Sequence, residues 1–172
     1  MWPAAGVASP AAKAGRELII RTDGAARGNP GPASLGAVII DASRPDAWDP
    51  AAPADASISE YLGRQTNNVA EYTGVVRALD LARRLGAVEV HLLLDSKLIV
   101  EQLAGRWRVK DAKLAPLHAD AWQALAAFRR WTARHVPRAQ NAAADALANA
   151  AIDRVAAGGP TTVEWIGSGL DP

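Results

Sequence analysis

The chain has 172 residues, of which 49% are hydrophobic and 22% are charged, a composition that suits one domain with a real core. It contains no cysteine, which excludes disulfides, zinc–thiolate sites and thiol catalysis, so catalysis would have to use oxygen ligands or histidine. A formal net charge of +1 says little about partners, but Arg and Lys gather within residues 106–110 and 129–138, and such local patches can serve a polyanion.

The N-terminal residues 1–16 are rich in Ala, Gly and Pro, and we expect them to form a disordered tail. Pro3 and Pro10 interrupt this weakly apolar stretch and no Lys or Arg precedes it, so it does not resemble a signal peptide. No run of about 18 apolar residues occurs, which argues against a membrane span. We therefore expect a soluble, cytoplasmic protein.

The first part of the chain predicts three antiparallel strands. Apolar, β-branched runs at residues 18–22 and 35–40 are joined by a Gly-Asn-Pro-Gly turn at 28–31. A third strand is predicted at 58–62, after a loop rich in Pro and Asp at 43–55.

The middle of the chain predicts a helix followed by a buried strand. Apolar residues recur at helical spacing from Val69 to Leu85, and Gly86 supplies the stop. Residues 88–94 are almost continuously apolar, the pattern of a strand covered on both faces, and we expect this strand to be the central one.

The remaining elements complete a domain that we place at residues 17–157. Helices are predicted at 96–104, 114–128 and 141–157, with a strand at 131–136 before the last helix. Residues 158–172 are predicted to be either a loose C-terminal tail or, at 161–166, a short strand. The expected fold class is α/β, with a five-stranded mixed sheet flanked by helices on both faces.

Four carboxylates lie at the beginnings or ends of these predicted elements: Asp23, Glu71, Asp95 and Asp145. Hard cations prefer carboxylate oxygens, so the set is typical of a metal-dependent nuclease. Asp95 ends a buried strand, which is where open α/β sheets place their ligands.

Each carboxylate also has a purely structural interpretation. Asp23 precedes a glycine and could begin a turn. Asn68 and Glu71 fit a capping box, and Asp95 could cap the next helix. Asp145 lies in the first turns of a predicted helix, where the helix dipole favours any acidic residue. No single one of these acids decides the function.

Four motifs occur in a fixed order along the chain: Asp-Gly-x-x-x-Gly-Asn-Pro-Gly at 23–31, Thr-Asn-Asn-x-x-Glu at 66–71, Asp-Ser-Lys at 95–97 and His-Val-Pro-Arg-x-x-Asn-x-x-Ala-Asp at 135–145. With these motifs the chain resembles ribonuclease H of type 1 over residues 17–157. It is most similar to the bacterial and archaeal branch without the basic handle, because residues 105–114 leave no room for an extra helix. It also resembles the ribonuclease domain of actinobacterial proteins that carry a phosphatase domain.

The resemblance implies an endonuclease that hydrolyses the RNA strand of RNA–DNA hybrids and leaves 5′-phosphate and 3′-hydroxyl ends. It implies two Mg²⁺ ions, with Mn²⁺ as an alternative. The residue matching Asp23 would bridge the ions, the one matching Asp145 would hold the ion on the nucleophile side, and those matching Glu71 and Asp95 would complete the other ion. The implied partner is a hybrid, bound by a monomer.

An RNA strand is distinguished by its 2′-hydroxyls, which are read by amides and by close backbone approach. The candidate substrate-binding residues are Gly28, Asn29, Thr66, Asn67, Asn68 and Trp107. By resemblance, Thr66 would seat a phosphate of the DNA strand, and Trp107 with the basic residues beside it would lie towards the DNA channel.

Two further residues compete for an assisting catalytic role. His135 precedes Asp145 by ten residues, as does the loop histidine that assists turnover in many relatives, although a histidine at a strand end can be structural. Arg138 is the rival, because arginine is suited to phosphate. Two other functions remain open: a non-catalytic hybrid-binding module and another nuclease of this fold, such as a junction resolvase.

Overall fold

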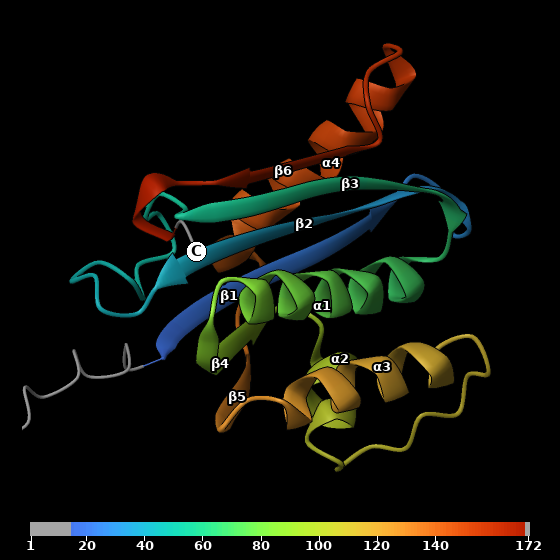
Figure 1. Ribbon diagram of the computed structural model, residues 1–172. Helices are drawn as coiled ribbons and strands as arrows, with labels where there is room; N and C mark the ends of the chain where they lie inside the picture. The colour runs from blue at the N-terminus through green and yellow to red at the C-terminus, as the bar shows by residue number, and fades with distance from the viewer. Residues whose placement is uncertain (1–14, 171–172) are drawn as a thin grey trace, which may run out of the picture.

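The computed structural model describes residues 15–170, so residues 1–14 of the predicted tail lie outside the described part. The described residues form six strands and four α-helices (Figure 1). In chain order they are β1 (Arg16–Ala26), β2 (Gly31–Asp41), β3 (Ala56–Gln65), α1 (Asn67–Arg84), β4 (Ala87–Leu94), α2 (Lys97–Leu103), α3 (Ala115–Ala126), β5 (Arg130–His135), α4 (Ala142–Ala156) and β6 (Thr162–Ile166), with short 3₁₀ turns at Arg138–Asn141 and Ser168–Leu170.

The strands form one mixed sheet in the order β5-β4-β1-β2-β3-β6. The first three strands are antiparallel neighbours, as predicted, whereas β1, β4 and β5 run parallel to one another. The expectation that β4 is the central strand is wrong, because β4 lies next to the edge strand β5 while β1 and β2 form the middle pair. The α/β class of the prediction is confirmed.

The predicted count of five strands is wrong by one. Residues 162–166 form β6, which pairs antiparallel with β3 along its edge, so the strand alternative for this segment is confirmed. Most β6 side chains are exposed, including Val163 and Trp165, so the strand buries little apolar surface. It is held by main-chain pairing and by an ion pair in which Arg84 Nη2 lies 2.8 Å from Glu164 Oε2.

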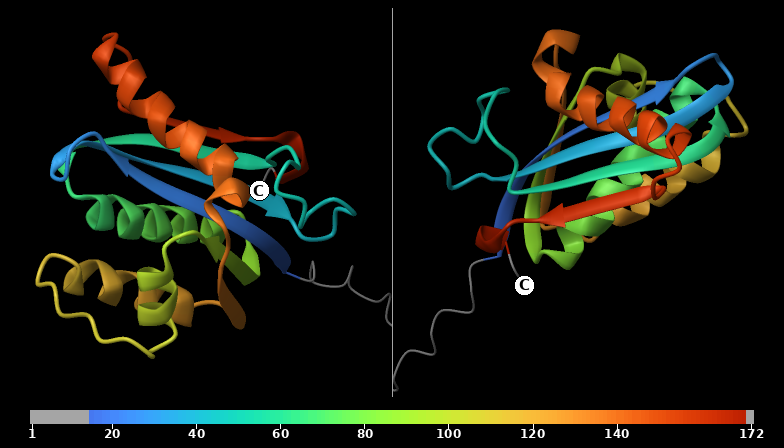
Figure 2. Two further views of the ribbon diagram at one scale, coloured as in Figure 1. Left: turned by 180° about the vertical axis from the view of Figure 1, so that it is seen from behind. Right: turned by 90° about the horizontal axis from the view of Figure 1, so that it is seen from above.

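Helices cover both faces of the sheet, as predicted. On one face α1 packs on β1 and β2, with α2 and α3 beside it, and on the other face α4 crosses β1, β2 and β3 (Figures 1 and 2). Alternate residues of β1 serve the two sides: Leu18 and Ile20 join the core under α1, while Ile19 joins a smaller core on the side of α4. None of the helices in residues 15–170 combines the length and hydrophobicity needed to span a membrane.

The prediction that the chain lacks the extra helix of the basic handle is also confirmed, since no helix lies between α2 and α3 in the described chain. The intervening segment is a loop without regular structure from Gly105 to Lys110, followed by a turn that leads into α3.

Helix α4 sits on the sheet only because β2 carries a glycine beneath it. A Cβ added at Gly36 would lie 2.0 Å from the carbonyl oxygen of Ala144 and 2.7 Å from the amide nitrogen of Ala148. Both contacts are to backbone that cannot rotate away. Because Asp145 follows Ala144 directly, Gly36 fixes how closely that carboxylate approaches the sheet.

We expect Gly36→Ala to destabilise the protein by on the order of 1–3 kcal/mol, the cost of overpacking a close contact. Gly74→Ala in α1 is the contrasting control, because its new Cβ would make ordinary contacts of 3.5 Å or more and alanine favours a helix by about 0.5–1 kcal/mol. Urea unfolding of both variants measures the difference. Equal stability of Gly36→Ala and the parent would show that α4 is not held in this close approach.

Candidate functional site

Asp23 is held near the carboxyl end of β1 with only 4% of its surface exposed. The next residue, Gly24, touches the first turns of α1: a Cβ there would lie 2.4 Å from the backbone nitrogen of Glu71. A side chain at position 24 would therefore force the helix away from the strand. This close approach places the Glu71 carboxylate beside Asp23.

Glu71 does not form the capping box that its spacing allows. Helix α1 begins at Asn67, and its N-cap is Thr66, whose hydroxyl accepts a hydrogen bond from the backbone N–H of Val69. The capping interpretation, with Asn68 as N-cap, is wrong because the helix starts two residues earlier than that pattern requires. Glu71 thus lies in the second turn, where its side chain is free to face the cleft.

Asp95 follows β4 directly and lies beside Asp23 because β1 and β4 are parallel and pair in register, with Thr22 opposite Leu94. The interpretation of Asp95 as a helix cap is wrong, since Ser96 accepts the hydrogen bond from the N–H of Ile99. One ligand oxygen from each of Asp23, Glu71 and Asp95 lies within 4.8 Å of the others. The three acids come from β1, from α1 and from the residue that follows β4.

Asp145 reaches the same cleft from the opposite face of the sheet. It lies in the first turn of α4, as predicted, and lines a cleft of about 550 Å³ with the three other acids. The side chain of Asn149 donates a hydrogen bond to Asp145 Oδ1 at 3.3 Å. All four predicted carboxylates therefore meet in one cleft.

Burial and mutual repulsion favour the protonated forms of Asp23 and Glu71. Burial, together with the nearby charge of Asp95, raises the pKa of Asp23 to about 7. Burial and the charges of Asp23 and Asp95 raise the pKa of Glu71 to about 10. A bound cation would reduce this repulsion, and carboxylate oxygens are the ligands that hard metal ions prefer. Both properties are those of a site for a hard metal ion.

Asn141 is a structural member of the site to which the sequence motif alone assigned no role. It is 1% exposed and donates a hydrogen bond of 2.7 Å to the carbonyl oxygen of Thr22, the residue before Asp23. Burial raises the pKa of Asp95, while the charge of Arg138 and a hydrogen bond from Asn141 oppose that rise. Asn141 thus joins the turn before α4 to both strands that carry acids.

One of the predicted substrate-binding residues lines this cleft, and most of the others lie in the two segments next to it. Asn67 lines the cleft, and its backbone N–H donates to Asn29 Oδ1 at 3.1 Å, which connects the β1–β2 turn to α1. Gly28, Asn68 and Thr66 belong to the same two segments. Trp107 lies apart from them, in the loop after α2, with the ammonium of Lys97 5.9 Å from its ring centre.

The structure separates the two candidates for an assisting role. Arg138 lines the acidic cleft, whereas His135 lines a different cavity. His135 Nε2 lies 3.2 Å from the backbone carbonyl oxygen of Asp95 and so contacts the main chain of the site rather than its carboxylates.

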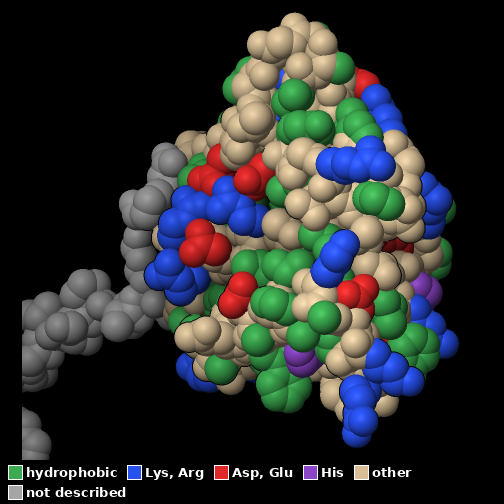
Figure 3. Space-filling model, turned by 90° about the vertical axis from the view of Figure 1, so that its right-hand side faces the viewer, with side chains coloured by type: hydrophobic (Ala, Val, Ile, Leu, Met, Phe, Trp, Pro, Cys, Tyr) green, Lys and Arg blue, Asp and Glu red, His purple; other side chains and the backbone are tan. Residues whose placement is uncertain are grey.

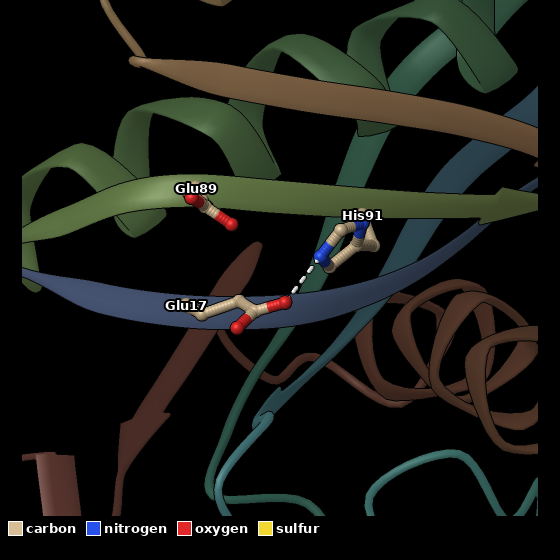
Figure 4. Close-up of side chains that lie close together, drawn as sticks. All are labelled: Glu17, Glu89 and His91. Carbon is tan, nitrogen blue, oxygen red and sulfur yellow. Dashed lines mark hydrogen bonds and ion pairs between the residues drawn. The ribbon is translucent and has the colours of Figure 1, made fainter.

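A second group of possible metal ligands lies at the other end of the sheet, where Glu17, Glu89 and His91 converge (Figure 4). Its members are already satisfied by protein groups. His91 Nε2 lies 2.6 Å from Glu17 Oε1, its Nδ1 lies 2.7 Å from the hydroxyl of Thr132, and Glu89 pairs with Arg130 at 3.1 Å. Hydrogen bonds and an ion pair across three strands account for this group.

Comparisons with known proteins agree with this geometry. A family model described as reverse transcriptase-like matches residues 21–151. A protein named ribonuclease H from Thiobacillus denitrificans is 34% identical over 147 residues, which cover 77% of this chain and 90% of the relative. The chain belongs to the ribonuclease H family.

Two other members of the ribonuclease H family extend the comparison. The bifunctional protein Rv2228c of Mycobacterium tuberculosis is 46% identical over 140 residues, which cover 81% of this chain but only 36% of that protein. A solved structure of LC11-RNase H1 in complex with RNA/DNA hybrid has a TM-score of 0.72 and 38% identity, covering 81% of this chain and 99% of the other. The chain thus spans about a third of the mycobacterial relative, within which it matches a ribonuclease H domain.

The raised pKa of Asp23 generates a prediction about metal-free stability. The folded protein keeps a proton on this group up to about pH 7, whereas the ordinary value is 3.8, so stability should fall as the pH rises through that window. In EDTA we expect a higher melting temperature near pH 5 than near pH 8, and a smaller difference for Asp23→Asn, which cannot ionise there. A variant that loses as much stability as the parent across this range would exclude Asp23 as a source of the effect.

Proposed function

We propose that the protein is a metal-dependent endoribonuclease that hydrolyses the RNA strand of RNA–DNA hybrids and leaves 5′-phosphate and 3′-hydroxyl ends. The observation that carries the proposal is the convergence of the four carboxylates Asp23, Glu71, Asp95 and Asp145 in one cleft. Membership of the ribonuclease H family supports it, as does the hybrid in the complex of LC11-RNase H1.

The donor set fits two Mg²⁺ ions, since it offers carboxylate oxygens alone and the protein compensates their charges only in part. When bound, such ions supply an activated water and stabilise the leaving oxygen. The four acids would hold the ions, with Asp23 between the other three. Arg138, at the rim of the cleft, would bind a phosphate oxygen of the substrate.

Recognition of the RNA strand would use the amide groups next to the acids. Asn67 lines the cleft, and its backbone N–H donates to the side chain of Asn29, so Asn29, Asn67 and Asn68 lie in two segments that contact each other. Such amides can both donate to and accept from a 2′-hydroxyl, which DNA lacks.

The DNA strand would lie towards the basic loop after α2. Arg106, Trp107, Arg108 and Lys110 line one shallow depression there, and Trp107 is 45% exposed. Figure 3 shows Lys and Arg side chains that project at separate places, with acidic side chains between them. A surface of this mixed kind favours contacts with particular phosphates over one extended field of positive charge.

A hybrid-binding module without catalysis is the main alternative. All four acids are present, and burial raises the pKa values of Asp23 and Glu71, which means that burying these two charges costs stability. A module that only bound nucleic acid would gain nothing from such repulsion. The geometry therefore favours a catalytic site.

The test is cleavage of three matched substrates in Mg²⁺: an RNA–DNA hybrid, duplex RNA and duplex DNA. We expect cleavage of the RNA strand of the hybrid, and we expect Asp23→Asn to abolish it while hybrid affinity is largely kept, because phosphate and 2′-hydroxyl contacts remain. Cleavage of duplex DNA instead would assign the fold to another nuclease activity. Appreciable hydrolysis by Asp23→Asn would remove Asp23 from the proposed metal site.

The positions of Arg138 and His135 generate a second test. Arg138→Ala should lower turnover of the hybrid more than its affinity, because Arg138 lines the acidic cleft, and His135→Ala should lower turnover less. Steady-state and binding measurements on both variants separate the effects. If neither variant changes the rate by more than about twofold, the segment from His135 to Asn141 is structural.

A further inference from the structure

A cavity of about 330 Å³ lies on the sheet face that α4 leaves open, next to the end of β5. Its walls include Arg21 of β1, Arg134 of β5 and Trp48, and no carboxylate lines it. Trp48 belongs to the loop at residues 42–55, which projects from the end of β2 (Figure 2). The segment from His135 to Gln140 separates this cavity from the acidic cleft.

Arg21 is a buried cation without an ion pair in the described chain. It is 3% exposed, and its Nη1 and Nη2 donate to the backbone carbonyl oxygens of Gln140 and Trp48, each at 3.1 Å. Its Nε has no hydrogen-bond partner. Asp49 is the acid whose charge acts on Arg21, but it lies beyond ion-pair distance. A buried charge held only by neutral carbonyls is costly unless an anion accompanies it.

Arg134 supplies a second guanidinium from the neighbouring side of the cavity. It is exposed, and among residues 15–170 it makes no ion pair. Its guanidinium carbon lies 5.2 Å from the centre of the Trp48 ring, so the aromatic side chain holds the cation at the cavity wall. Two guanidinium groups on the walls of one cavity are suited to the several oxygens of a phosphate.

Trp48 gives the cavity an aromatic wall. It is 45% exposed although it is large and apolar, and its neighbours Ala47 and Ala52 anchor the loop in the smaller hydrophobic core. The ring centre of Trp48 lies 5.3 Å from that of His91, and the part of the ring that stays exposed is a stacking platform for the flat face of a nucleobase. The volume of the cavity falls at the lower end of the range for small-ligand sites, which begins at about 300 Å³.

We propose that this cavity is a second binding site that takes the phosphate group of a nucleotide between Arg21 and Arg134, with the base against Trp48. The site is separate from the acidic cleft, and its existence does not depend on the proposed hydrolysis. The phosphate could belong to a free nucleotide or to an internal position of a nucleic acid strand, since both present non-bridging phosphate oxygens to the two guanidinium groups.

The test is calorimetric titration of the whole protein in EDTA, where the metal-free acids repel anions. The probes are AMP, inorganic phosphate and a dinucleoside monophosphate that carries only an internal phosphate. We expect binding at one site and, in parallel NMR spectra, a shift of the Trp48 indole N–H signal, which Trp48→Phe identifies. Tighter binding of AMP than of the dinucleoside assigns the site to free nucleotides, and the reverse order assigns it to a strand.

Arg134→Gln should weaken binding of the preferred probe by about tenfold or more, the loss of a charge-assisted contact. Arg129→Gln is the matched control, because it removes the same charge from an exposed position just before β5 and should leave the affinity unchanged. Absence of binding by all three probes at millimolar concentration would overturn the proposal. Equal losses in both variants, or an unmoved Trp48 signal, would also overturn it, since either result would place the anion elsewhere.

Discussion

The packing of β1 is the constraint on which the rest of the structure depends. This strand pairs with β2 on one side and β4 on the other, and helices cover both of its faces. Its residues from Leu18 to Ile20 are fully buried. The hydrophobic effect therefore holds the strand in place, and with it the carboxylate that follows at Asp23. Backbone contacts at Gly24 and Gly36 then set how closely α1 and α4 can approach the sheet.

The same packing brings buried carboxylates close together, and their repulsion destabilises the folded protein. Carboxylates that are taken out of water and placed next to one another favour their neutral forms, which is why the pKa values of Asp23 and Glu71 are raised. The protein compensates only in part, through the charge of Arg138 and the amide of Asn141 at Asp95. Stability that is lost to this repulsion would be recovered when a cation binds, so function and stability are coupled at this site.

Charged and aromatic groups away from the cleft are divided among separate surfaces. Trp107 and its basic neighbours lie beyond α2, on the side of the sheet covered by α1, whereas Arg21, Arg134 and Trp48 gather on the other face. Glu17 and His91 show that clustering alone does not make a site, because their hydrogen bonds are completed within the sheet. Buried Arg21 differs from them, since its charge has no anionic partner in the described residues.

The sequence by itself determined the α/β class, the antiparallel opening strands, the helices on both faces and the four acids, because these depend on local periodicity and on motifs with strict spacing. Only the tertiary structure decided that Thr66 caps α1, that β4 lies beside an edge strand and that a sixth strand is added at the edge of the sheet next to β3. The edge strand β6 is held by pairing with the backbone of β3 while most of its side chains stay exposed, so the sequence allowed either a tail or a strand in this segment. The cavity at Arg21 was equally hidden, because residues 21, 48 and 134 are distant in the chain and meet only when a loop folds over parallel strands.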